Sequence, residues 1–130
     1  VGSFLVKHLR INWTEGEKYF RNCLLDFNKA NNVAQWQWVA GCGADAAPYF
    51  RIFNPILQGE KFDKEGLYVR KWVPELDKVP SKFVHKPWEM ELKYQQAIKT
   101  IIGKDYPQPI VIHEKARALA LEAFQTLKRR

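Results

Sequence analysis

The stretch from Asn31 to Pro55, NNVAQWQWVAGCGADAAPYFRIFNP, gathers residue types that could hold a flat ligand. Trp36 and Trp38 stand with one residue between them, two asparagines come before them, and Arg51 follows. Indole faces stack on aromatic rings, amides both donate and accept hydrogen bonds, and a guanidinium binds phosphate. The stretch predicts either an aromatic-rich core or a surface for a flat ligand, and residue types alone leave both open.

The two tryptophans of this stretch differ in the direction that they face. The pattern of residues 33–41 predicts a short helix that ends at Gly41. In such a helix, Trp36 and Trp38 lie about 200° apart around the axis. One of them can therefore lie in the interior while the other lines a cleft. The alternative is that both are large core residues.

Polar residues just before this helix have two interpretations. Asn31 and Asn32 suit a helix N-cap, or a neutral amide placed against the edge of a heteroaromatic ring. Asp26 and Asn28 stand one turn earlier, as turn residues or as further polar contacts to the same ligand.

Other charged and aromatic residues could complete such a site. Arg51 and Lys61 would flank a cleft opened by Trp38 and bind phosphate, unless they are solvated charges. Trp13 suits a hydrophobic staple at a helix start. The remaining tryptophans, Trp72 and Trp88, have apolar and proline neighbours and are assigned to packing.

The elements that must position these residues are helical. A capping-box pattern of Thr14 and Glu17 opens one of them, and Cys23 falls on its apolar face. Pro48 and Pro55 prevent a continuous helix after residue 43, so an ordered loop is expected there, and Pro55 suits a helix start. Helical spacing covers residues 3–9, 14–26, 33–41, 56–63, 64–76, 88–102 and 113–128. The sequence predicts one all-α domain over residues 1–130.

Composition narrows the class of protein. The 130 residues carry a net charge of +7, and residues 66–130 contribute 13 basic and 7 acidic side chains, or +6. This imbalance favours an anionic partner such as DNA or RNA, with a solvated surface as the alternative. Two cysteines are too few for a disulfide framework and indicate reduced thiols in a cytoplasmic protein. The histidines lack ligand spacing, so no metal site is predicted.

Several motifs of the chain together resemble one family. INWTEGEKYF, the Asn31–Pro55 stretch, QGEKFDKEGLYVRKWVPEL, HKPW and DYPQPIV resemble, in order and spacing, the photolyase/cryptochrome family. The chain is similar to the C-terminal part of the FAD-binding domain of bacterial class I cyclobutane pyrimidine dimer photolyases. The resemblance implies an all-α fold and a light-driven lyase reaction, in which reduced FAD gives an electron to a flipped-out pyrimidine dimer in DNA.

The resemblance also implies roles for individual residues. Asp26, Asn28 and Asn32 would contact FAD, although most bacterial members have Asp where this chain has Asn28. Trp36 and Trp13 would relay electrons to the flavin.

On the DNA side, the resemblance implies that Trp38 forms the aromatic wall of the lesion pocket. Arg51 and Lys61 would contact the DNA strand. These three residues would therefore bind DNA that contains pyrimidine dimers.

The resemblance covers only part of the family's architecture, because the antenna domain and the upstream half of the FAD domain would lie outside this chain. An isolated 130-residue fragment is therefore expected to be inactive and to self-associate through surface exposed by truncation. Two alternatives remain: a cryptochrome-like blue-light photoreceptor, and a degenerate domain without catalytic function.

Overall fold

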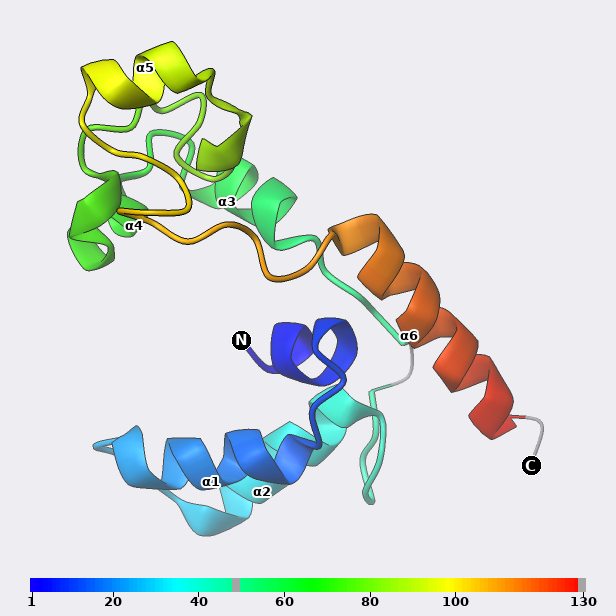
Figure 1. Ribbon diagram of the computed structural model, residues 1–130. Helices are drawn as coiled ribbons and strands as arrows, with labels where there is room; N and C mark the ends of the chain where they lie inside the picture. The colour runs from blue at the N-terminus through cyan, green and yellow to red at the C-terminus, as the bar shows by residue number, and fades with distance from the viewer. Residues whose placement is uncertain (48–49, 129–130) are drawn as a thin grey trace. The chain divides into compact units, whose positions relative to one another are not determined.

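The computed structural model describes residues 1–47 and 50–128, and it contains helices joined by turns (Figure 1). Within these residues, the only bridge of the β type is an isolated one between Ile102 and Tyr106. The expected all-α class is confirmed. The expected interruption at Pro48 lies outside the described residues. None of the described helices is both long enough and apolar enough to cross a membrane.

The chain divides into two compact units. Unit 1 comprises Val1–Phe53 and Val111–Arg130, and unit 2 comprises Asn54–Ile110. Unit 1 holds a π-helical turn, η1, and three α-helices. Their bounds are Phe4–His8 for η1, Trp13–Cys23 for α1, Lys29–Ala40 for α2 and His113–Lys128 for α6. Helices α1 and α2 pack against each other, and η1 contacts α1, α2 and α6.

Asparagines, rather than the predicted residues, begin both helices of the α1–α2 pair. The Asn12 side chain accepts a hydrogen bond from the backbone N–H of Thr14 at 3.0 Å, so the expected capping box at Thr14 is wrong. The Asn28 side chain accepts from the backbone N–H of Asn31 at 3.0 Å. Neither Asn31 nor Asn32 is therefore the N-cap of α2, and the side chain of Asn32 is available for a tertiary contact.

Two other predicted helix boundaries are confirmed. Gly41 ends α2 with φ of 76°, a left-handed conformation that glycine adopts without steric cost. Pro55 is the first residue of α3. Asn54, which precedes it, is the N-cap, and its side chain accepts hydrogen bonds from the backbone N–H groups of Ile56 and Leu57.

Unit 2 is built from short helices around a small apolar core. The α-helices are α3 (Pro55–Phe62), α4 (Leu67–Trp72) and α5 (Leu92–Ala97), with 3₁₀ turns η2 (Pro74–Leu76) and η3 (Pro87–Glu89). The buried core residues are Leu76, Val79, Val84 and Met90. Since these come from turns as much as from helices, unit 2 depends on tertiary packing rather than on helix propensity.

The long helix expected over residues 88–102 is wrong, because α5 spans only Leu92–Ala97. The chain leaves the helix at Lys99, whose φ is 57°. The buried side chain of Gln95 stabilises this ending: its Nε2 donates to Met90 O at 2.7 Å, and its Oε1 accepts from Ile102 N at 2.9 Å. The run of Thr and Ile after Lys99 is also β-branched, which disfavours helix.

Two side chains lie at the surface against expectation: Trp72, which was assigned to packing, and Cys23, which was placed on an apolar helix face. Trp72 is 63% exposed, and its ring lies beside that of Tyr68. The Lys71 ammonium lies 5.0 Å from the centroid of the Trp72 ring. Cys23 is an exposed free thiol because α1 ends at this residue. Trp88 is half-buried, in keeping with packing.

Candidate functional site

Helix α2 separates its two tryptophans as its geometry requires. Trp36 is only 4% exposed, and Phe20 meets it edge-on at 5.1 Å between ring centroids. A Cβ atom added to Gly16 would lie 2.2–2.6 Å from the Trp36 ring, so this ring lies directly on the backbone of α1. Trp13 stands one turn before Gly16 on the same helix. The α1–α2 pair therefore brings the turn of Trp13 and the ring of Trp36 together.

Trp38 has the opposite environment. It is 39% exposed, and it borders a hollow of about 140 Å³. The loop after α2 folds back on this position, since Ala47 N–H donates to Trp38 O at 3.3 Å. The other residues lining the hollow are Ala34, Gln35, Gln37, Cys42, Ala44 and Asp45. The prediction that one tryptophan is interior while the other lines a cleft is consistent with this arrangement.

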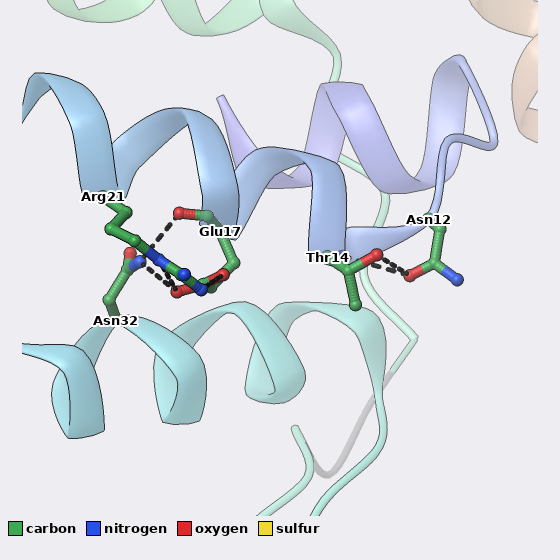
Figure 2. Close-up of polar contacts among 5 residues, drawn as sticks. All are labelled: Asn12, Thr14, Glu17, Arg21 and Asn32. Carbon is green, nitrogen blue, oxygen red and sulfur yellow. Dashed lines mark hydrogen bonds and ion pairs between the residues drawn. The ribbon is translucent and has the colours of Figure 1, made fainter.

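A buried polar cluster joins α1 to α2 (Figure 2). Asn32 Nδ2 donates to Glu17 O at 3.0 Å and to Glu17 Oε1 at 3.2 Å. Arg21 Nη2 donates to Glu17 Oε2 at 2.6 Å, and Arg21 Nε donates to Glu17 Oε1 at 3.3 Å. Asn32 and Glu17 are both buried. Because Nδ2 is held by Glu17, the amide orientation of Asn32 is fixed, with Oδ1 turned away from the carboxylate.

Sequence reasoning missed the role of Glu17, which it interpreted as part of a helix cap. A buried carboxylate needs a partner of opposite charge, and Arg21 supplies it from the next turn of α1. The spacing of Glu17 and Arg21, four residues apart on a helix, was the available signal. The contact with Asn32 is tertiary and has no counterpart in local spacing.

Asp26 and Asn28 lie at the exposed connection between α1 and α2. The Oδ1 atom of Asn28 caps α2, which leaves its Nδ2 as a donor. Asn28, the N-cap of α2, and Asn32 are four residues apart, and Asn32 N–H donates to Asn28 O at 2.9 Å. Asp26, Asn28 and Asn32 therefore present an exposed carboxylate, an exposed amide and a buried amide held by Glu17.

The two expected phosphate-binding residues belong to different units. Arg51 is an exposed residue of unit 1, with its guanidinium carbon 5.4 Å from the Phe53 ring centroid. Lys61 is an exposed residue of α3 in unit 2, with Nζ 5.1 Å from the Phe62 ring centroid. The expectation that both flank a single cleft stays a prediction.

A buried lysine behind Arg51 was not anticipated. Lys7 is 4% exposed, and its Nζ donates to Arg51 O at 2.5 Å. The same ammonium lies 4.8 Å from the Phe50 ring centroid. Burial, and then the charge of Arg51, hold the pKa of Lys7 below its usual range. Lys7 fixes the backbone of the segment that carries Arg51. Its position in an apolar run, SFLVKHL, was the only sequence signal.

A pair of histidines joins η1 to α6. Nitrogen Nε2 of His8 lies 2.8 Å from Nδ1 of His113, so one ring donates a hydrogen bond to the other. His8 is buried, and its ring also lies beside Phe4. Burial, and then the charge of His113, lower the pKa of His8 from 6.5. A hydrogen bond between these two nitrogens needs one of them to be unprotonated.

The stability of unit 1 is expected to fall with acidification because of this pair. A histidine whose folded-state pKa is below its unfolded-state pKa stabilises the fold fully above the unfolded value. That contribution is lost as the pH falls from 6.5 through the folded pKa. The midpoint of thermal unfolding should drop over this range, and His8→Gln should flatten the drop. His85→Gln, in unit 2, is the matched control, and equal flattening by both substitutions would contradict the assignment.

Comparisons with known proteins show the family of the chain. A family model described as the FAD binding domain of DNA photolyase matches residues 1–126. Two deoxyribodipyrimidine photo-lyases are similar in sequence. The protein of Agrobacterium fabrum is 57% identical over 99% of this chain and 27% of its own length. The protein of Escherichia coli is 53% identical over 98% of this chain and 26% of its own length.

Solved structures are also similar to this chain. A class III photolyase from Agrobacterium tumefaciens has a TM-score of 0.92 and 56% identity over 99% of this chain and 27% of its own. A cryptochrome from Synechocystis has a TM-score of 0.85 and 35% identity over 93% of this chain and 25% of its own.

The helical fold and the family match together define a flavin-domain protein. The chain belongs to the family of the FAD-binding domain of DNA photolyase. It spans about a quarter of the length of the relatives that it matches.

Proposed function

We propose that this chain is the C-terminal part of the FAD-binding domain of a cytoplasmic DNA photolyase that splits cyclobutane pyrimidine dimers. The observation that carries the proposal is the division of α2, with Trp36 buried against α1 and Trp38 exposed beside a hollow. The names of the relatives support the same activity. The motifs favour a class I photolyase, whereas the similar structure from Agrobacterium tumefaciens is a class III photolyase, and the proposal holds for either class.

In this proposal, Asp26, Asn28 and Asn32 hold the flavin. FAD, when bound, supplies the light-driven electron that opens the cyclobutane ring. Asn32 offers a neutral amide whose orientation is set by Glu17 and through it by Arg21. A neutral group can support the flavin edge without bringing a net charge to it.

Trp36 and Trp13 form the electron path toward the flavin. Burial of Trp36 between Gly16 and Phe20 holds its ring in one orientation. A fixed, closely packed indole keeps the same separation from its neighbours in every molecule, as electron transfer requires.

Trp38, Arg51 and Lys61 act on the DNA side. An exposed indole offers a face on which a flipped base can stack, while the two cations bind phosphates of the strand. The Synechocystis similarity makes a cryptochrome-like photoreceptor the alternative. Binding of dimer-containing DNA with catalytic turnover under light distinguishes repair from signalling.

A crossed pair of substitutions in the full-length protein tests these roles. Trp36→Phe should slow photoreduction of the flavin at least several-fold and leave repair by chemically pre-reduced protein nearly unchanged. Trp38→Ala should leave photoreduction intact and weaken binding of dimer-containing DNA by roughly 1–3 kcal/mol, the contribution of one base–aromatic stack. Flavin absorbance during illumination and fluorescence anisotropy of a labelled oligonucleotide give the two measurements.

Each variant serves as the control for the other, because both remove one indole from the same helix. Equal losses of photoreduction and repair in Trp36→Phe would refute its place in the relay. Unchanged affinity in Trp38→Ala would exclude it from the lesion pocket. We further propose that the isolated 130-residue chain neither retains FAD nor repairs DNA.

A further inference from the structure

A second hollow in unit 1, of about 340 Å³, has a basic rim, and the DNA contacts proposed above account for only one of its two arginines, Arg51. Two guanidiniums, those of Arg51 and Arg117, come from segments more than sixty residues apart in sequence and border the same space. Both arginines are exposed. The hollow is lined by Phe50, Arg51, Ile52, Phe53, Arg117 and Leu121. Its rim is therefore cationic, and its remaining lining is apolar.

Lys7 adds a third positive charge behind this hollow. Its buried ammonium donates to Arg51 O and lies over the ring of Phe50. Phe50 in turn stacks on Phe124 of α6, with 4.2 Å between ring centroids and 4° between ring planes. These contacts hold the segment of Arg51 against α6, so the two guanidiniums are presented by one packed structure.

Lys7, Arg51 and Arg117 form no ion pair with an acidic side chain among the described residues. The ion pairs there join Arg21 to Glu17, Lys86 to Glu60 and Glu89, and Lys93 to Glu91. Charges beside apolar, poorly polarisable walls interact more strongly than charges in water. An unbalanced pair of planar guanidiniums in such a setting favours an oxyanion that accepts two parallel hydrogen bonds, above all a phosphate group.

We propose that Arg117 and Arg51 together bind a phosphate group of the DNA strand, with Lys7 as a positioning residue. This inference rests on the proposed function. The chain itself supplies the link to the DNA side: Ala47 is hydrogen-bonded to Trp38, and Phe50 follows three residues later. Three residues span at most about 11 Å. A strand whose base stacks on Trp38 reaches such a distance within a few nucleotides.

The test uses the full-length photolyase polypeptide that carries this chain. Dissociation constants are measured by fluorescence anisotropy for a single-stranded oligonucleotide without damage and for the same oligonucleotide with one pyrimidine dimer, between about 50 and 200 mM salt. Arg117→Gln should weaken binding of both by the same factor. It should also reduce the slope of log K against log salt by about 0.7, the value of one phosphate contact on a single strand.

Two further variants make the comparison specific. Lys115→Gln removes an equal charge from the same helix, two residues from Arg117 and outside the lining of the hollow, and should change the slope by much less. Arg117→Lys retains the charge without the planar fork and should restore most of the slope. Circular dichroism and retained FAD should be unchanged in every variant, since the Arg117 side chain is exposed.

An unchanged slope in Arg117→Gln overturns the proposal. Loss of retained FAD with an unchanged slope also overturns it and assigns the hollow to the diphosphate of the cofactor. A wild-type protein that binds damaged and undamaged strands equally well refutes lesion recognition instead. In that case the slope of the undamaged strand still decides whether Arg117 contacts a phosphate.

Discussion

Gly16→Ala is expected to destabilise the protein by about 2 kcal/mol, because the new methyl group would occupy the space of the Trp36 ring. The added Cβ would lie 2.2 Å from Cη2 and 2.4 Å from Cζ3 of that ring. Overpacking of a core costs about 1–3 kcal/mol, and a distance so far below van der Waals contact puts this case at the upper end. The better helix propensity of alanine offsets about 1 kcal/mol. Urea denaturation followed by circular dichroism measures the difference.

Two companion variants separate the clash from other effects. Asn22→Ala changes an exposed residue of α1 and should be neutral or slightly stabilising. In a Trp36→Phe background, the ring atoms that clash are absent, so Gly16→Ala should lose most of its cost. A Gly16→Ala penalty that is equally large in both backgrounds would show that the contact between α1 and α2 does not limit this position.

Glu17→Ala should produce the second large effect, a loss of about 2 kcal/mol. The substitution removes the charged acceptor of Asn32 Nδ2 and the partner of Arg21. Hydrogen bonds to charged groups contribute about 1.5–3 kcal/mol, and Glu17 O remains as a second acceptor for the amide. Glu15→Ala, an exposed acidic residue of the same helix, is the control and should change stability by less than about 0.5 kcal/mol.

A second measurement distinguishes positioning of Asn32 from stability alone. Gly16→Ala and Glu17→Ala are expected to lose similar amounts of stability, but only Glu17→Ala removes one of the two hydrogen bonds that hold the amide of Asn32. The fraction of FAD retained by the full-length protein should therefore fall further in Glu17→Ala. Equal retention in the two variants would mean that Glu17 acts on the fold and not on the flavin contact.

Local rules in the sequence determined several elements of this protein. Gly41 ends α2 because only a residue without a side chain adopts a left-handed φ at no steric cost, and Pro55 begins α3 because its missing N–H needs no partner there. Helical period alone predicted α6. The same period placed Trp36 and Trp38 on different sides of α2, and packing against α1 then decided which of them is buried, at 4% and 39% exposed.

Tertiary structure decided what local pattern could not. The sequence pattern predicted a helix through residues 88–102. In the structure, the side chain of Gln95 is hydrogen-bonded to backbone groups before and after α5, which keeps this helix short. The predicted cap residue Glu17 instead binds Asn32, fifteen residues away. Lys7, Arg51 and Arg117 are charged residues with no shared motif, and only packing of η1 and residues 50–53 with α6 brings them together. Side-chain hydrogen bonds and burial depend on which segments meet in space, and residue spacing within one segment does not contain that information.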